Sequence, residues 1–299
     1  MKLKTLLFSG ALFTFAAINA QKPIVIQEDS LNLGANRYPA ISVLIPEVKY
    51  EKTRKNWIRK QETGTKSKVV DDAGKMSIFG AKSKNVSPDP FNILSMLADQ
   101  DSVLRLTAAF EIRKDVYIER STGEAELAKA KTFLFDFAKD QYTDLVNDQL
   151  KQEQSKLKDL EKELRSLEKR QSGMEKDIRT GNRQLVTERE KLTLLNNELT
   201  TSTTALAEHN AEYMVMEPGD EKDAKARYIK DLEKQKRSTV RSIKKSEKRI
   251  RNAESKISRA NRAIPKNDST QERIRRLIND QENVVQLFSD KLSKVKAFK

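Results

Sequence analysis

The sequence predicts an α+β N-terminal domain followed by a long all-α antiparallel coiled-coil hairpin. Three observations lead to this prediction: strand-like segments fill residues 22–122, apolar residues recur every seven positions after Glu124, and the single Pro-Gly pair, Pro218-Gly219, interrupts that repeat. The composition agrees, because 34% of the 299 residues are charged and only nine are glycine, which is typical of long helices. We expect the two parts to cover residues 21–122 and 123–299.

The first twenty residues, MKLKTLLFSGALFTFAAINA, have the pattern of a secretory signal peptide. Two lysines precede an apolar run that is too short to span a bilayer, and a small residue, Ala20, ends the segment. We expect cleavage after Ala20, with an uncleaved anchor as the alternative. The chain has no cysteine, and no later segment has the roughly 20 apolar residues of a membrane helix. An exported protein is therefore expected, in the periplasm of a diderm bacterium or secreted beyond the cell.

The small domain shows short segments rich in β-branched residues, which is typical of strands. These segments are residues 40–46, 67–72, 76–80, 102–112 and 115–119. Residues 48–61 predict an amphipathic helix, in which Trp57 and Ile58 stand among basic residues. A second helix is expected within residues 87–100, with Asp89 as its N-cap and Pro90 at its first position.

A seven-residue apolar repeat predicts that residues 124–215 form the first arm of the hairpin. The repeat holds its phase for about nine heptads, with one polar lapse, Gln171. The companion positions of the seam include several polar residues, which weaken it and set its register. The first series comprises Leu150, Leu157, Leu164, Gln171, Ile178, Leu185, Leu192, Leu199, Leu206 and Tyr213, and the polar companions include Glu153, Glu188, Ser202 and His209.

The repeat resumes after a turn at residues 216–221. Isoleucines spaced by seven or fourteen residues mark a return arm over 222–263. A break is expected at 264–270, because Pro265 lacks the amide hydrogen that an inner helical turn requires. Ser269 and Glu272 have the spacing of a capping box, which predicts a final helix over 271–298.

A hairpin centred on Pro218-Gly219 pairs residues whose numbers sum to about 437. This register places Ile257 beside Gly181 and Ile264 opposite Gly173, and it brings the C-terminal end back towards Phe137. The helix-weakening residues of the two arms, Gly173 and Pro265, then lie at the same level along the hairpin. This coincidence favours a closed hairpin over a single rod. A second reversal at Pro265, giving a three-helix bundle, is the alternative.

Positive charge is concentrated on the return arm. Residues 222–263 contain sixteen basic and five acidic residues, whereas 124–215 contain fifteen basic and eighteen acidic ones. The excess cations form either a solvated face partly neutralised by the other arm or a surface for an anionic envelope polymer. The candidate anion-binding residues are Lys234, Lys236, Arg237, Arg241, Lys244, Lys245, Lys248, Arg249 and Arg251. Nucleic acid is a disfavoured partner, because no aromatic residues alternate with these cations and an apolar stripe runs through them.

An apolar group precedes the turn, and it is a candidate contact for a partner. Its residues are Tyr213, Met214, Val215 and Met216. Methionine is suited to adaptable binding surfaces. The alternative is that this group closes the end of the coil against Tyr228 and Ile229.

No pattern in the sequence predicts catalysis. P-loop, dinucleotide-binding, nucleophile-elbow and zinc-protease motifs are missing from the sequence. The one histidine, His209, belongs to the seam far along the coil, and Asp71 and Asp72 point to opposite faces of a predicted strand. We therefore predict no catalytic, cofactor or metal site.

The export signal, the basic charge and the hairpin pattern of residues 124–299 resemble the Skp (OmpH-type) periplasmic chaperones. That resemblance implies trimers whose helical arms enclose unfolded outer-membrane proteins. The chain differs in its added N-terminal domain and its longer hairpin, and no residue motif is shared. Its architecture is also similar to coiled-coil activators of wall hydrolases and to uncharacterised exported coiled-coil proteins of bacteria.

These observations lead us to expect a non-enzymatic structural or interaction protein of the bacterial cell envelope. Its partners would be envelope proteins or an anionic polymer, and homo-oligomers are an open alternative. The competing hypothesis is a Skp-like holdase for unfolded envelope proteins.

Overall fold

The computed structural model describes residues 23–72, 74–101 and 103–298, which divide into two compact units. Of these described residues, the first unit contains those up to Leu157 and those from Gln281 on, and the second unit is Lys158–Asp280. The predicted signal peptide, 1–20, lies outside the described residues. Within the described part of the chain, no helix combines the length and apolar character needed to cross a membrane.

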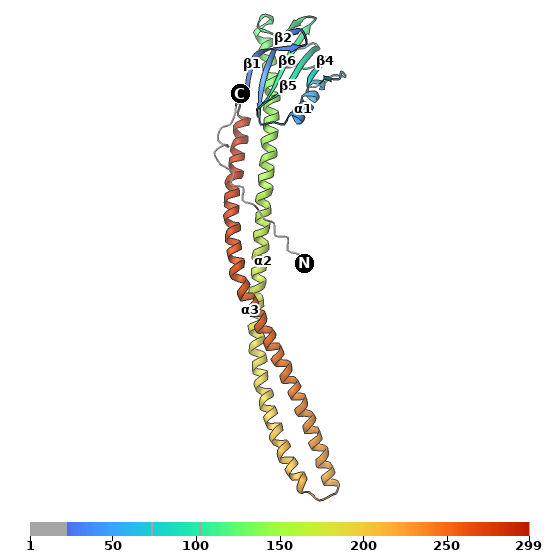
Figure 1. The fold of residues 1–299 in the computed structure, drawn as a ribbon, viewed down its shortest axis with the longest axis vertical. Coiled ribbons are helices and arrows are strands. Elements are labelled where there is room, and N and C mark those ends of the chain that lie inside the picture. The colour runs from blue at the N-terminus through green and yellow to red at the C-terminus, as the bar shows by residue number, and fades with distance from the viewer. Residues whose placement is uncertain (1–22, 73, 102, 299) are drawn as a thin grey trace. The chain divides into compact units, whose positions relative to one another are not determined.

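An antiparallel sheet forms most of the N-terminal domain (Figure 1). Its strands lie in the order β1-β2-β6-β5-β4-β3, and the short β7 pairs with β6. Every described pairing is antiparallel. The strands are β1 (Val25–Leu33), β2 (Asn36–Pro46), β3 (Val70–Asp72), β4 (Lys75–Ala81), β5 (Phe91–Gln100), β6 (Val103–Arg113) and β7 (Val116–Tyr117).

One face of this sheet is buried under helix α1 (Tyr50–Glu62) and the first turns of α2 (Glu124–Val215). Trp57 of α1 is completely buried there, as the predicted amphipathic helix required. Its ring centroid lies 4.9 Å from that of Phe137, and its Nε1 donates a hydrogen bond of 2.9 Å to the Ser95 hydroxyl. Trp57 therefore links α1 to both α2 and the sheet.

The helix predicted within residues 87–100 is wrong, because Phe91–Gln100 forms strand β5. Burial alternates along it: Phe91, Ile93 and Ser95 face the core, whereas Leu94 between them is half-buried. This period of two is that of a strand, so the pairing with β4 and β6 overrides the local capping signal of Asp89 and Pro90.

Strand β1 was not predicted from the sequence. Its segment, VIQEDSLNL, carries polar residues that hide its alternation. It pairs with β2 along its whole length, with Leu33 opposite Asn36. Gly34, between them, has a φ of +63°, which suits the first position of a two-residue hairpin turn.

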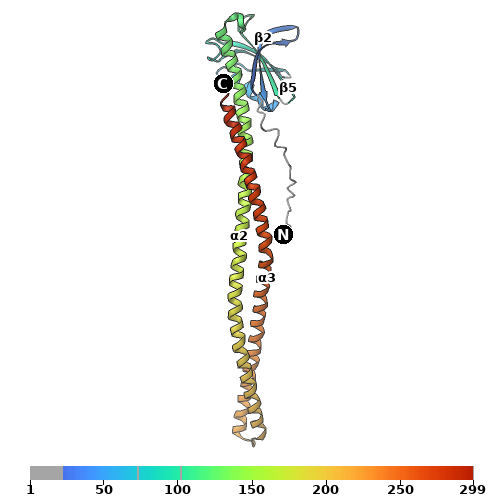
Figure 2. The same ribbon diagram turned by 90° about the vertical axis from the view of Figure 1, so that its left-hand side faces the viewer.

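Helices α2 and α3 (Asp220–Lys296) run antiparallel beside each other and form the predicted helical hairpin (Figures 1 and 2). The predicted register is confirmed at Gly181 and at the C-terminal end of α3, whereas Gly173 is exposed and does not meet Ile264 as expected. In the second unit, a Cβ atom built on Gly181 would lie 2.7 Å from Cγ1 of Ile257. In the first unit, Lys139 Nζ donates a hydrogen bond of 2.7 Å to the carbonyl oxygen of Phe298, which lies beside the buried Tyr142.

The break expected at 264–270 is wrong, because α3 continues through Pro265. Pro265 and Asn261, whose carbonyl loses its helical partner, are both exposed on the outer side of α3. Water can therefore satisfy that carbonyl, while buried Asn267 and Ala260 hold the helix against α2. A continuous α3 also excludes the three-helix alternative.

The two glycines of the second unit that the register singles out should respond oppositely to alanine. Nothing lies within 4 Å of a Cβ built on Gly173, so Gly173→Ala should stabilise the hairpin by about 0.5–1 kcal/mol through helix propensity. Gly181→Ala should destabilise it, because its methyl group overlaps Ile257. Urea unfolding followed by circular dichroism measures both changes.

The control is a double-mutant cycle. In an Ile257→Ala background the overlap is gone, so Gly181→Ala should become stabilising by about the same 0.5–1 kcal/mol. A stabilising Gly181→Ala in the wild-type chain would show that the two helices do not approach here as described.

Candidate functional site

The tip of the hairpin is formed by residues 216–219, which connect α2 to α3. Just before them, Met214 and Val215 have exposed fractions of 80% and 84%. Tyr213 and Met216, the other two candidate contact residues, are half-buried. The group therefore has an anchored part and an open part, and the open part is apolar.

The anchored part is held by a lysine from the start of α3. Lys222 Nζ donates a hydrogen bond of 2.7 Å to the carbonyl oxygen of Met216, and it lies 5.2 Å from the ring centroid of Tyr213. This position satisfies a carbonyl beyond the end of α2 and places a cation over an aromatic face. The turn is thus tied to both helices.

A polar and aromatic layer lies one to two turns below the tip. The rings of His209 and Tyr228 meet edge to face, with centroids 4.9 Å apart, as the register predicts. Lys225 Nζ lies 2.8 Å from Nδ1 of His209 and forms an ion pair with Glu212. The hydrogen bond from Lys225, and then that from His209, hold the pKa of the Glu212 carboxyl below its usual range. His209 therefore has a structural role in this layer.

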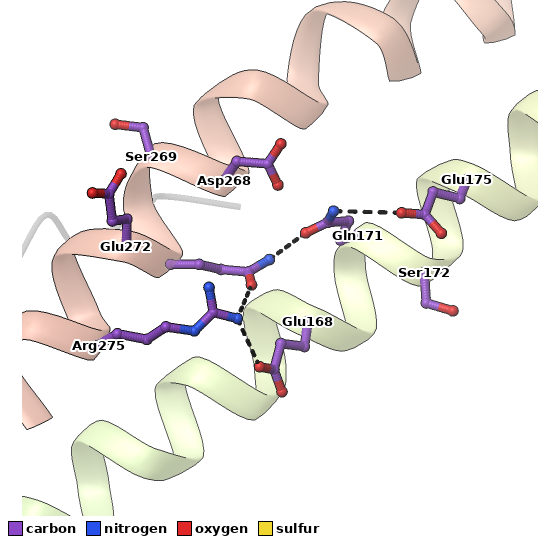
Figure 3. A pocket seen from close by; sticks show the side chains of 9 residues that line it. Glu168, Gln171, Ser172, Glu175, Asp268, Ser269, Glu272 and Arg275 are labelled. Atoms are coloured by element: carbon purple, nitrogen blue, oxygen red, sulfur yellow. Dashed lines mark hydrogen bonds and ion pairs between the residues drawn. The ribbon is translucent and has the colours of Figure 1, made fainter.

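A second polar layer crosses the hairpin near Pro265 (Figure 3). Gln171, the polar lapse of the heptad series, accepts hydrogen bonds from the buried side chains of Asn267 and Gln271. Asn267 also donates to the carbonyl oxygen of Leu167, at 3.1 Å. Arg275 bridges Gln271 to Glu168, at 3.1 and 3.2 Å. Buried polar pairs of this kind set the register of helices.

The polar companion Glu188 also pairs with a residue of α3, through one of its two carboxylate oxygens. Its carboxylate is buried and accepts a hydrogen bond of 2.8 Å from Arg249 of α3. Hydrogen bonds from Arg249, and then from Ser246, lower the pKa of Glu188. Arg249, one of the nine candidate anion-binding residues, therefore links α3 to α2 through Glu188.

The other candidate anion-binding residues divide by their position on α3. Lys236 is half-buried, because it occupies the seam series of Ile229 and Ile243. The remaining seven are exposed: Lys234, Arg237, Arg241, Lys244, Lys245, Lys248 and Arg251. Arg227 and Lys230, outside the predicted set, are exposed on the same side of the helix.

Asp71 and Asp72, the adjacent carboxylates of the small domain, lie in different environments. Asp71 forms an ion pair with Arg54 and accepts a hydrogen bond from the Gly74 amide, whereas the neighbouring Asp72 is exposed. Among the described residues, no three His, Cys, Asp or Glu side chains are grouped so as to hold a metal ion.

No protein-family model matches the chain, and a search of curated proteins finds no match either.

Proposed function

We propose that this chain is a non-enzymatic interaction protein of the bacterial cell envelope that contacts a protein partner through the tip of its helical hairpin. The observation that carries the proposal is the exposure of Met214 and Val215 beside a turn that is held by specific contacts. Closure of the coil would bury these side chains. The signal-like first twenty residues support the envelope location.

The contacts at the tip hold its surface in one conformation before a partner binds. Lys222 and Lys225 tie the turn and the end of α2 to α3, so a partner would meet a patch that is already organised. Pre-organisation lowers the entropy cost of binding. Methionine and aromatic residues are also enriched at the cores of protein interfaces.

The distribution of exposed apolar residues favours a single contact over a holdase. Elsewhere in the described part of the second unit, the large apolar side chains that are exposed are Val186, Leu194, Tyr228 and Leu277. Tyr228 packs against His209, and the other three are spread along the helices. A holdase would need a broad apolar surface to cover an unfolded chain.

The test is the double variant Met214→Gln and Val215→Gln, with Leu194→Gln as the matched control. Leu194 is 70% exposed and lies away from the tip. We expect the tip variant to keep the thermal stability of the wild type, because exposed substitutions change it by no more than about 0.5 kcal/mol. The tip variant should fail to capture an envelope protein that both the wild type and the control capture in stoichiometric amounts.

Two outcomes would contradict this function. If the tip variant loses more than about 1 kcal/mol of stability, the group closes the coil instead of binding a partner. If the wild type and the tip variant suppress the aggregation of a denatured outer-membrane protein equally well, the chain is a holdase that uses another surface.

A further inference from the structure

An outer stripe of eight cations runs along α3 on the side away from α2. Its residues occupy two heptad columns three residues apart, so they share one side of the helix, opposite the seam isoleucines. All eight are exposed, and the stripe is about 36 Å long at the rise of an α-helix. The columns are Arg227, Lys234, Arg241 and Lys248, and Lys230, Arg237, Lys244 and Arg251.

The cations of the outer stripe contribute little to holding the hairpin together. Within the described residues, Arg237 is the one member with an ion pair, to Glu233 of the same helix at 3.5 Å. By contrast, the neighbouring Arg249 and Lys256 reach across to acids of α2. The outer stripe is therefore distinct from the cations, such as Arg249 and Lys256, that form ion pairs between the two helices.

Like charges within the outer stripe also repel one another. Arg237 precedes Arg241 by four residues, and Lys244 precedes Lys248 by four. Such pairs destabilise an isolated helix by a few tenths of a kcal/mol each. A bound anion would remove this repulsion, so the arrangement favours an anionic ligand.

The form of the outer stripe indicates what kind of anion it would bind. Its two columns contain no apolar or aromatic side chain. A protein interface has an apolar core, an interfacial helix inserts apolar residues between lipids, and non-specific binding of single-stranded nucleic acid uses aromatic residues that stack on the bases. A narrow line of cations instead matches a linear polymer with a charge on each repeating unit.

We propose that the outer stripe binds a linear phosphate-bearing polymer along α3. Half of the stripe is arginine, whose planar guanidinium pairs with phosphate oxygens at two points, and the lysines add point charges between them. Binding is electrostatic and releases counterions, so its affinity falls steeply as salt rises. This ligand is separate from the partner at the tip.

The test measures fluorescence anisotropy of end-labelled inorganic polyphosphate titrated with the full chain, from about 50 to about 200 mM salt. The stripe variant carries Lys234→Gln, Arg241→Gln, Lys244→Gln and Lys248→Gln. It should bind at least about tenfold more weakly at the lowest salt, and its salt slope should fall by roughly 3, because four contacts are lost.

The matched control removes four charges from α2, as Lys158→Gln, Lys169→Gln, Arg170→Gln and Lys176→Gln. These residues are exposed and in no described ion pair, so the control should bind within about twofold of the wild type. Circular dichroism checks that both variants keep their helices. Equal losses in the two variants would overturn the proposal, since net charge alone would then explain binding.

Two further binding measurements distinguish the phosphate polymer from other anionic ligands. Tighter binding of a single-stranded oligothymidylate of equal charge would identify a nucleic-acid surface and overturn the proposal. Stripe-dependent binding to anionic phospholipid vesicles, with none to polyphosphate, would identify a membrane surface and also overturn it. Met214 and Val215 are intact in the stripe variant. A loss of polymer binding can therefore be told apart from a loss of partner binding at the tip.

Discussion

Trp57→Ala is expected to destabilise the N-terminal domain by about 3–5 kcal/mol, the range for emptying a large aromatic site in a core. Trp57 is fully buried, and its ring contacts Phe133 and Phe137 of α2. Removing the indole leaves a cavity among three elements and leaves the Ser95 hydroxyl without its donor. Hydrogen exchange measured on peptides from β5 and β6 should show the loss of protection.

Two variants make the Trp57 experiment specific. Trp57→Phe keeps most of the ring but loses the donor to Ser95, so its cost should be nearer 1–2 kcal/mol, roughly one lost hydrogen bond plus imperfect packing. Phe79→Ala removes a ring that is mostly exposed, and it should have little effect. Wild-type protection in Trp57→Ala would mean that α1 does not hold the sheet to α2.

Tyr142→Ala is the second change with a large expected effect, also about 3–5 kcal/mol. Tyr142 is fully buried and packs against Val146 and Val295, so it joins α2 to the C-terminal end of α3. Lys291 lies over its ring and forms an ion pair of 2.7 Å with Glu47. We expect residues 281–298 to lose hydrogen-exchange protection and to become sensitive to protease.

The matched control for this site is Tyr142→Phe. The hydroxyl of Tyr142 donates a long hydrogen bond, 3.3 Å, to Glu47, so its loss should cost no more than about 1.5 kcal/mol. Burial, and then the negative charge of Glu47, raise the pKa of the phenol, which keeps it neutral and able to donate. Equal effects of the two variants would assign the stability to the hydroxyl instead of the ring.

The hairpin could be predicted from the sequence to within about a residue, because one turn and two heptad series determine which residues meet. Gly181 and Ile257 illustrate this, since their contact follows from the position of Pro218-Gly219. The break expected at Pro265 is absent for a physical reason. A helix tolerates a proline better where the freed carbonyl can bond to water, and that depends on the side of the helix that the carbonyl faces.

The small domain was harder to predict, because its strands depend on partners that are distant in sequence. A helix-start signal, Asp89-Pro90, precedes strand β5, and only the pairing of β5 with β4 and β6 shows its alternation. Strand β1 is recognisable mainly by Gly34 and its pairing with β2.

The sequence identifies most residues of the candidate surfaces, but it does not show which of them are exposed on the same side. Charge counting located the basic arm, yet Lys236 is half-buried and Arg249 pairs with Glu188, while Arg227 and Lys230 extend the outer stripe. Assigning each cation to its heptad position would have separated these groups. The exposure of Met214 and Val215 depends on where α2 ends and α3 begins, which the heptads alone leave open.

The layer of Gln171, Asn267 and Gln271 has a consequence for how the chain avoids misfolding. In a repetitive hairpin, alignments shifted by one heptad are the main competing structures, because leucines and isoleucines still meet. A shift of seven residues would put Leu164 or Ile178 in the place of Gln171, whose side-chain oxygen accepts hydrogen bonds from Asn267 and Gln271. Their amide groups would then be buried without that partner, at a cost of about 1–3 kcal/mol. The layer thus lets a misaligned hairpin reopen before it becomes a kinetic trap.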